Sequence, residues 1–596
     1  MKIRTIILSI IAIPLIGCTS DRQRIEAPKT TPTPNAVLSP VPKDASAPTS
    51  EATSFSTPGA ESSAWPKPAG SYYYYMEAHL QQRKNNPEKA MEFLNRAMEL
   101  DPESRFLKKE SALLNIQQKN NKRALEIVEA LVKEGDDVEM MLLYGRLKHA
   151  AKQMDAAKEI YEKVLAKDPK QENAYMILGS IYMDEKKYDR AYEIYRRLVE
   201  HFPASYIGHY FIGKIHSERG DLAAAEKAYK RTLELQPELE EPLIGLVEIY
   251  KSLGQTEKVV ETYQELIGNN SDNIGAVLEF GLYRDALGDR EAAEKLLKPL
   301  GEESLSDTNI IQKIVQMYLN PKKYKEALTI LNYMTDEGPG SSDLHYLLGV
   351  ACSGLEKDQE ATVHFQKVEP GSRFYSNAVV HIAFAYQEQG DTNKAIRFLT
   401  EARKNLPEDP DVLLYLGSFY EEIEDFEKAA ETLQEGIQLD PKHVRLHFRL
   451  GVVNDKWGRK SESIEIMKKV IQLDPQNANA LNYLGYTYAD SGENLEEAER
   501  LIREALKYKP EDGYITDSLA WVYYKMGSYG KAVELLEKAV LLVPDDPIIL
   551  EHLGDAYLKI DDRAKALESY RRSLLHKKKD KGEIEKKIET LTGRGI

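Results

Sequence analysis

Cysteine is nearly absent from this chain, which has only Cys18 and Cys352 among its 596 residues. Two cysteines cannot form the disulfide framework that holds many small secreted domains together. Cys352 falls on the inward-facing side of a helical pattern, where we expect it to be a small buried core residue. Disulfide bonds are therefore excluded as the basis of this fold.

Positive charge is also in deficit, because 80 Lys and Arg stand against 96 Asp and Glu, for a formal net charge of −16. Such a surface repels a phosphate backbone, so we expect no nucleic-acid partner. The length of the chain exceeds the roughly 250 to 300 residues at which a single core stops growing. Several domains or an extended repeat array are therefore expected.

Long apolar runs are missing as well. Residues 6–16 are almost wholly apolar, but a segment that crosses a bilayer needs about 20 such residues. This run follows the basic residues Lys2 and Arg4, in the proportions of a secretory signal peptide. It ends in Leu-Ile-Gly-Cys at 15–18, which resembles the lipobox of bacterial lipoprotein precursors.

The lipobox resemblance implies that residues 1–17 are a lipoprotein signal peptide and that Cys18 becomes the lipidated first residue of the mature chain. Three acyl chains such as palmitate would form a stable membrane anchor. Thr19 follows the cysteine in place of Asp, which implies sorting to the outer membrane, with the protein facing the periplasm. An ordinary secretory signal with an incidental cysteine is the alternative.

Residues 18–70 contain nine prolines among Ser, Thr and Ala, and no apolar periodicity. Such a segment buries too little apolar surface to offset the entropy of ordering, so we expect a disordered tether. A fully extended tether of this length would reach roughly 160 Å. The folded part could therefore act well away from the membrane.

From Ser71 onward the sequence resembles itself every 34 residues. Position 8 is Gly or Ala in thirteen of the fifteen repeats and Val in the other two. The residues in chain order are Ala78, Ala112, Gly145, Gly179, Gly213, Val247, Gly281, Val315, Gly349, Ala383, Gly417, Gly451, Gly485, Ala520 and Gly554. Position 20 is Ala in thirteen of fifteen, and position 32 is Pro in ten. This period and these positions resemble the tetratricopeptide repeat (TPR), a pair of antiparallel helices.

The TPR resemblance implies an all-α fold, a right-handed superhelical solenoid of about fifteen helix-turn-helix repeats. Repeats 1–7 cover residues 71–307 and repeats 8–15 cover residues 308–580, while residues 581–596 form a C-terminal capping helix and tail. The repeats between residues 240 and 375 are the least regular, with Pro299 inside a predicted second helix. We predict that this section is the most weakly coupled part of the stack.

No phosphate-binding, dinucleotide-binding, zinc-protease or serine-hydrolase motif occurs in the chain. His443 and His447 have the spacing of metal ligands on a helix, but no third ligand is marked nearby. We therefore expect no catalytic residue, no metal, no cofactor and no small-molecule substrate.

Binding of protein partners is expected instead, because TPR proteins hold polypeptides in a concave groove lined by positions 2, 5, 9, 12 and 13 of each first helix. The aromatic residues at these positions are Tyr72, Tyr75, Phe106, Tyr210, Tyr346, Phe384, Phe448, Tyr486, Tyr514, Trp521 and Tyr524. Aromatic side chains are common anchors of protein interfaces, and the residues from Tyr486 to Tyr524 form the strongest patch. The alternative is that several of these rings only pack against neighbouring helices.

One TPR binding mode is not expected here. The carboxylate clamp needs Lys at position 5 and Asn at position 9 of one first helix. Lys109 is the only Lys at position 5, and position 9 of the same helix is Leu113. The favoured interpretation is a membrane-anchored scaffold or adaptor for periplasmic proteins, with recruitment of a protease or cell-wall hydrolase by analogy to long TPR lipoproteins. The alternatives are a structural component of an envelope secretion, pilus or exopolysaccharide export machine and, least favoured, an enzyme without a known motif.

Overall fold

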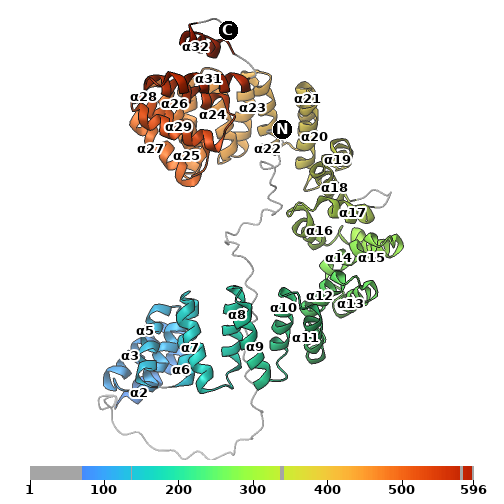
Figure 1. The fold of residues 1–596 in the computed structure, drawn as a ribbon, viewed down its shortest axis with the longest axis vertical. Coiled ribbons are helices and arrows are strands. Elements are labelled where there is room, and N and C mark those ends of the chain that lie inside the picture. The colour runs from blue at the N-terminus through green and yellow to red at the C-terminus, as the bar shows by residue number, and fades with distance from the viewer. Residues whose placement is uncertain (1–69, 136, 336–340, 578–580, 594–596) are drawn as a thin grey trace, which may run out of the picture. The chain divides into compact units, whose positions relative to one another are not determined.

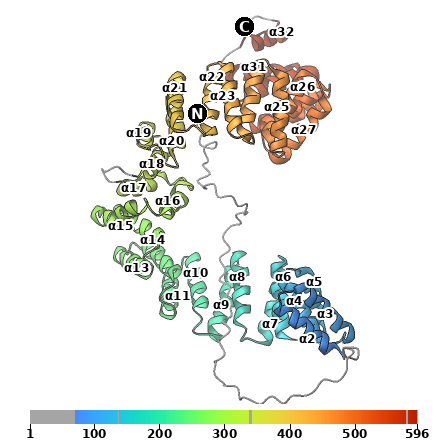
Figure 2. The ribbon, with the colours of Figure 1, turned by 180° about the vertical axis from the view of Figure 1, so that it is seen from behind.

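The computed structural model describes residues 70–135, 137–335, 341–577 and 581–593, and every regular element in these ranges is a helix. The lipidation residue Cys18, the signal peptide 1–17 and all but the last residue of the tether 18–70 lie outside the described residues. The predicted all-α helical-repeat fold is confirmed. Figures 1 and 2 show the helices following one another as antiparallel pairs.

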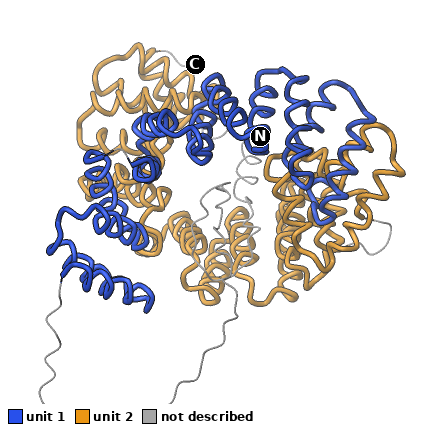
Figure 3. The backbone as a smooth tube through the Cα atoms, turned by 90° about the horizontal axis from the view of Figure 1, so that it is seen from below, with its two compact units in different colours: residues 1–276 blue, residues 277–596 orange. Residues whose placement is uncertain are grey.

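Two compact units divide the chain between Ala276 and Val277, inside helix α14 (Figure 3). The helices of unit 1 are α2 (Ser71–Arg83), α3 (Pro87–Leu100), α4 (Arg105–Gln117), α5 (Asn121–Glu134), α6 (Val138–Ala150), α7 (Met154–Lys167), α8 (Glu172–Asp184), α9 (Tyr188–His201), α10 (Tyr206–Glu218), α11 (Leu222–Leu235), α12 (Glu240–Ser252) and α13 (Thr256–Asn269), followed by α14 (Ile274–Ala286).

The helices of unit 2 after α14 are α15 (Arg290–Glu303), α16 (Thr308–Ile314) with the π-helical η1 (Val315–Leu319), α17 (Tyr324–Met334), α18 (Ser342–Gly354), α19 (Asp358–Gln366), α20 (Tyr375–Glu388), α21 (Thr392–Ala402) with the 3₁₀ turn η2 (Arg403–Asn405), α22 (Pro410–Glu422), α23 (Phe426–Leu439), α24 (Val444–Lys456), α25 (Lys460–Leu473), α26 (Ala478–Ser491), α27 (Leu495–Tyr508), α28 (Gly513–Lys525), α29 (Tyr529–Leu542), α30 (Pro547–Lys559), α31 (Arg563–His576) and α32 (Gly582–Thr592). Together the described residues form fifteen hairpins and one final helix.

The turn inside each hairpin contains a residue with positive φ, which closes the first helix in the left-handed conformation. These residues are Asn85, Lys119, Lys152, Lys186, Gly220, Gly254, Gly288, Lys322, Glu356, Gly390, Glu424, Gly458, Gly492, Gly527 and Asp561. In the thirteenth repeat the extra residue lies in this turn, where both Gly492 and Asn494 have positive φ. The turn therefore repeats with the period of the sequence.

The small residue at position 8 accommodates a large side chain from the second helix of the same hairpin. A Cβ atom at Gly179 would lie 2.5 Å from the ring of Tyr195, and one at Gly554 would lie 2.4 Å from the ring of Tyr570. Position 20 is buried throughout, as at Ala191. The two helices of a hairpin can approach closely because these positions lack bulk.

Position 3 of the repeat is buried in every hairpin except the first. The buried residues are Leu107, Met140, Ala174, Gly208, Pro242, Ala276, Ile310, Leu344, Ala378, Val412, Leu446, Ala480, Ile515 and Ile549. The equivalent residue of the first hairpin is Tyr73, which is 46% exposed. Within each compact unit the first helix of a later hairpin packs against the second helix of the hairpin before it, as α10 does against α9 and α24 does against α23.

The repeats between residues 240 and 375, which the sequence marks as the least regular, contain irregular helices. Pro299 lies inside α15, and the first helix of the eighth hairpin changes to π-helix at Val315. Helix α19 spans only nine residues and ends at Gln366, ahead of Pro370 and Gly371. Proline removes a helix hydrogen bond and π turns insert an extra residue, so both disturb regular hairpin packing.

Candidate functional site

The strongest predicted patch lies on the first helices of the last hairpins, centred on α28. This helix packs against α26, α27, α29 and α30. The indole of Trp521 stacks on Tyr524 at 4.7 Å between ring centres, with an angle of 4° between the planes. The indole also stacks on His552 of α30 at 4.2 Å between ring centres. The half-buried rings of Trp521 and Tyr524 and the buried ring of His552 form one aromatic array.

The array is anchored by a buried polar pair that the sequence reasoning missed. His552 Nδ1 lies 2.9 Å and 3.2 Å from the two carboxylate oxygens of Asp517, and both side chains are buried. Burial alone lowers the pKa of His552, but the hydrogen bond with Asp517 and the charges of Asp517, Asp555 and Glu551 outweigh it and raise that pKa. The pair therefore fixes the imidazole against Trp521.

The indole N–H of Trp521 is buried and has no hydrogen-bond partner among the described residues. The ring of Tyr524 also meets Tyr529 edge to face at 5.4 Å. Tyr486 lies on α26, the first helix of the preceding hairpin, and is half-buried. Burial, followed by the charges of Asp490 and Asp517, raises its pKa to about 12. The predicted residues Tyr486, Trp521 and Tyr524 thus lie in one polar and aromatic environment.

A charged network closes the C-terminal end beside this array. Lys587 of α32 lies 3.0 Å from a carboxylate oxygen of Glu551 and 2.8 Å from one of Asp555. Lys577 also pairs with Glu551, at 2.8 Å, and the hydroxyl of Tyr570 donates to Asp555 at 2.6 Å. Each of the two acidic groups thus has a cationic partner, so neither is left as an unpaired half-buried charge.

The middle group of predicted residues is only partly accessible. Tyr346 is fully buried and stacks on Phe374 at 4.6 Å, so its ring cannot contact a partner. This corrects its assignment to an exposed surface, because the loop before α20 brings Phe374 over the tyrosine. Phe384 and Phe448 are half-buried. Phe384 packs edge to face on Phe419 at 5.3 Å.

The remaining predicted rings differ in exposure. Phe448 meets Tyr483 edge to face at 6.1 Å, and the half-buried Tyr210 packs in the same way on Phe211 at 5.2 Å. Tyr514 at the start of α28 is 51% exposed and is the most accessible predicted residue of the C-terminal patch.

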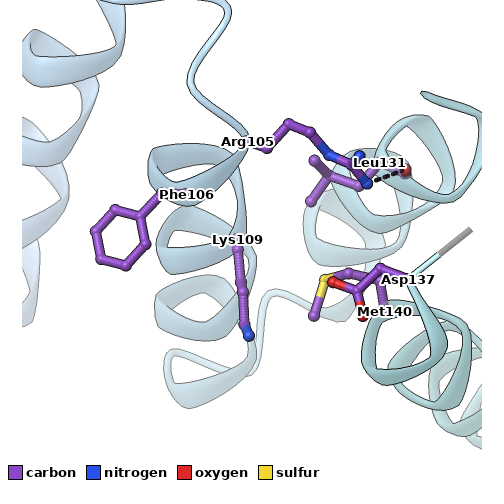
Figure 4. Close-up of a pocket in the computed structure, with 6 residues that line it drawn as sticks. All are labelled: Arg105, Phe106, Lys109, Leu131, Asp137 and Met140. Carbon is purple, nitrogen blue, oxygen red and sulfur yellow. Dashed lines mark hydrogen bonds between the residues drawn. The ribbon is translucent and has the colours of Figure 1, made fainter. Parts of the chain in front are cut away.

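At the N-terminal end, Tyr72 and Phe106 are 71% and 53% exposed, and the half-buried Tyr75 meets Phe106 edge to face at 5.1 Å. Figure 4 shows the adjacent hollow, of about 200 Å³, lined by Arg105, Phe106, Lys109, Leu131, Asp137 and Met140. Small-molecule pockets usually enclose about 300 to 1,000 Å³. The hollow is therefore smaller than a typical ligand pocket.

The two basic side chains that line this hollow, Arg105 and Lys109, each contact another residue. The Arg105 guanidinium donates to the carbonyl of Leu131 at 3.4 Å, and Lys109 pairs with Glu139 at 2.5 Å (Figure 4 shows the first contact). The hydrogen bond with Glu139 raises the pKa of Lys109, so the ammonium stays charged. The hollow thus combines satisfied basic groups with the exposed ring of Phe106.

The predicted metal-like histidine pair is explained by local bonding. His443 caps α24 by accepting from the N–H of Leu446, and the Nε2 of His447 lies 3.0 Å from the carbonyl of Pro441. Within the described ranges no group of three or more His, Cys, Asp or Glu side chains is arranged to hold a metal ion. No described helix is both long and apolar enough to cross a membrane.

Sequence signals for the missed pair were present. Asp517 occupies position 5 of its repeat, one of the positions used to select the aromatic residues, and His552 stands at position 6 of the next repeat. Both are buried titratable residues in first helices whose other buried residues are mostly apolar. A search for oppositely charged or titratable residues at positions 5 and 6 of adjacent first helices would have found them.

Hairpins stacked in register, with aromatic residues on their first helices, define a helical-repeat protein of the kind that binds other polypeptides. Family models described as tetratricopeptide repeat match residues 71–104, 148–209, 208–239 and 375–584, together more than half of the chain. The chain therefore belongs to the tetratricopeptide repeat proteins. The family models identify its helical hairpins as tetratricopeptide repeats.

Individual relatives are distant or short. A TPR repeat-containing protein of Pseudomonas aeruginosa is 46% identical over 56 residues, so the chain matches only 10% of that protein's length and 9% of its own. Among solved structures, Naa15/Naa10 bound to HypK-THB is 15% identical, with coverage of 88% of this chain and 89% of that chain and a TM-score of 0.40. Yeast Tom70 is 16% identical, with coverage of 71% and 96% and a TM-score of 0.36. Similarities of this strength carry no information about partners.

Proposed function

We propose that this protein is a lipid-anchored, non-catalytic scaffold that binds protein partners in the bacterial envelope through the first helices of its hairpins. The observation that carries this proposal is the aromatic array of Trp521, Tyr524 and His552, held in place by Asp517. Rigid aromatic side chains bind polypeptide at low entropic cost, since few rotamers are lost on binding. A preorganised array of this kind suits a protein partner.

The membrane anchor is a proposal from the sequence alone. Its support is the order of features before the repeats: Lys2 and Arg4, the apolar run 6–16, and Leu-Ile-Gly-Cys ending at Cys18. Three acyl chains on Cys18 would hold the protein to a bilayer stably. We place the protein at the outer membrane, facing the periplasm, because Thr19 follows the cysteine.

Within this function, we favour an adaptor that brings a protease or a cell-wall hydrolase to its site of action. A structural part of a secretion, pilus or export machine is the alternative. Capture of the tagged full-length chain from its own cells, followed by mass spectrometry, separates the two. Recovery of a hydrolase supports the adaptor, and recovery of pore or pilus subunits supports the machine.

The binding surface is tested by comparing two double variants in that capture experiment. Trp521→Ala with Tyr524→Ala removes the stacked rings, and we expect the recovered partner to fall by at least about tenfold, as for an interface hot spot. Tyr508→Ala with Leu541→Ala removes side chains that are 41% and 81% exposed at the ends of second helices, and should leave capture unchanged. Equal recovery with both variants, at equal helical content, would exclude the array as the binding surface.

The anchor is tested separately with Cys18→Ser. We expect the unsubstituted chain to incorporate labelled palmitate and to sediment with outer-membrane fractions, and the Cys18→Ser chain to do neither. An unacylated wild-type chain in the cytosol would refute the anchor without affecting the binding surface.

A further inference from the structure

Helix α2 exposes a row of large apolar side chains on its outer face. Tyr73, Met76 and Leu80 are 46%, 48% and 42% exposed, and the neighbouring Tyr72 is 71% exposed. Spacings of three and four residues place Tyr73, Met76 and Leu80 in one stripe along the helix. A stripe with this spacing is the pattern by which one helix packs against another.

The repeat register shows what this stripe is shaped to receive. Tyr73 and Leu80 occupy positions 3 and 10, which in the next hairpin are Leu107 and Leu114. Those two leucines are 4% and 1% exposed and share a core cluster with Leu94 of α3. The outer face of α2 is therefore built like a face that packs against the second helix of a preceding hairpin.

The preceding part of the chain is a poor source of that helix. Nine prolines stand between positions 28 and 68, and proline in a helix interior removes a hydrogen bond and clashes with the preceding turn. The longest interval without proline in this stretch, residues 49–57, is rich in Ser and Thr. We therefore take the covering element from another molecule.

The opposite end of the stack is closed in a different way. Helix α32 buries Ile584 and Ile588, and carries the charged residues Glu585, Lys586 and Glu589. A polar terminal helix of this kind keeps a repeat stack soluble. Head-to-tail stacking of the apolar N-terminal face on a C-terminal end is thus disfavoured, which leaves pairing of two N-terminal ends.

We propose that α2 pairs with α2 of a second copy of this chain, antiparallel and around a two-fold axis near Met76. In this arrangement Tyr73 of one copy faces Leu80 of the other, because both residues lie equally far along the helix from a centre between residues 76 and 77. A two-fold contact uses the same surface twice and closes after two copies. The dimer would present two sets of partner-binding surfaces from one junction.

Cysteine cross-linking of the full chain in its own membranes tests the geometry. Met76→Cys should cross-link two copies of the same variant. Tyr73→Cys should cross-link to Leu80→Cys when the two variants are co-expressed, but two copies of Tyr73→Cys, or two copies of Leu80→Cys, should not cross-link. Leu541→Cys, at a position 81% exposed, and the unsubstituted chain serve as controls for random collision and for Cys18. Cross-linking of Met76→Cys no stronger than that of Leu541→Cys would overturn the proposal.

A second measurement keeps the proposal testable if the thiols react slowly. Light scattering of the detergent-purified full chain should give a two-copy mass, and Tyr73→Glu with Leu80→Glu should reduce it to one copy with unchanged helical content. Leu541→Glu with Leu575→Glu, two exposed positions near the other end, should leave the two-copy mass intact. A one-copy mass for the unsubstituted chain would contradict the proposal. Cross-linking of Met76→Cys to a different protein would also contradict it. The same holds if lipid shields the Met76→Cys thiol from a water-soluble maleimide and no cross-link forms.

Discussion

Tyrosines at equivalent repeat positions meet different chemical environments. Tyr195 and Tyr570 both occupy position 24, facing the glycine of their own hairpin. The hydroxyl of Tyr195 is buried without a hydrogen-bond partner among the described residues, whereas that of Tyr570 donates to Asp555 at 2.6 Å. Desolvation raises the pKa of both phenols, so both stay protonated at neutral pH. Tyr195 therefore serves only to pack the core of its hairpin, whereas Tyr570 also holds the carboxylate of Asp555 by a hydrogen bond.

This contrast predicts opposite effects for one substitution. Tyr195→Phe removes an unpaired buried hydroxyl, so we expect unchanged stability or a gain of about 1 kcal/mol in the free energy of unfolding. Tyr570→Phe removes a hydrogen bond to a carboxylate and should cost about 1.5–3 kcal/mol. Denaturant unfolding followed by circular dichroism measures both. A loss for Tyr195→Phe as large as for Tyr570→Phe would contradict the interpretation.

The buried Asp517–His552 pair predicts a pH-dependent stability. Because the folded state raises the pKa of His552, the pair contributes most below the unfolded pKa of about 6.5, and the contribution is lost as pH rises through the folded pKa. Asp517→Asn keeps the shape but removes the charge. We expect it to cost about 1.5–3 kcal/mol near pH 5.5 and less near pH 9.

Thermal unfolding of both chains across this pH range tests the prediction, with the ring protons of His552 as a direct titration signal. A stability difference that is constant with pH would show that His552 is not charged in the folded protein.

At the scale of elements, each hairpin is assembled around a close contact between its two helices. At Gly179 an added Cβ would come within 2.8 Å of three ring atoms of Tyr195, which is itself fully buried and stacks on Phe211 at 4.7 Å. Gly530, in α29, has no atom within 4 Å of an added Cβ and no positive φ. These two helical glycines therefore have different roles.

Alanine substitution separates the two roles. Gly179→Ala should destabilise the protein by about 1–3 kcal/mol, since overpacking outweighs the better helix propensity of alanine. Gly530→Ala should stabilise it by about 0.5–1 kcal/mol, because only the propensity changes. Comparable gains from both substitutions, measured by urea unfolding, would show that the contact at Gly179 is not tight.

At the scale of the whole molecule, the irregular repeats lie in the middle of the chain. They contain Pro299 in α15, the π turn from Val315 and the short α19, and the two compact units divide at 276 and 277. Segments with disturbed helix hydrogen bonds and fewer packed side chains open more readily than regular ones. The middle is therefore expected to be the least stable section.

Hydrogen exchange followed by mass spectrometry tests this expectation repeat by repeat. We expect amides between residues 240 and 375 to exchange faster, by about tenfold or more, than those of the regular hairpins α26–α31, which corresponds to a local opening free energy lower by about 1.4 kcal/mol. Comparable protection in all fifteen hairpins would refute the prediction.

The sequence alone determined the class of fold, because small residues at positions 8 and 20 recur with one period and each hairpin needs them for its own close contact. It could not determine which aromatic rings remain accessible. Tyr346 is buried under Phe374 and Tyr72 is exposed, although both stand at predicted groove positions.

Only the tertiary structure decided these outcomes, because exposure and pairing depend on residues of a neighbouring hairpin or loop. The contact between Asp517 and His552 joins residues 35 positions apart in the chain, and it forms because two first helices lie next to each other in the stack. Local patterns fix the helices and the hairpins, whereas the chemistry of the surface is set by what each hairpin meets across the next interface.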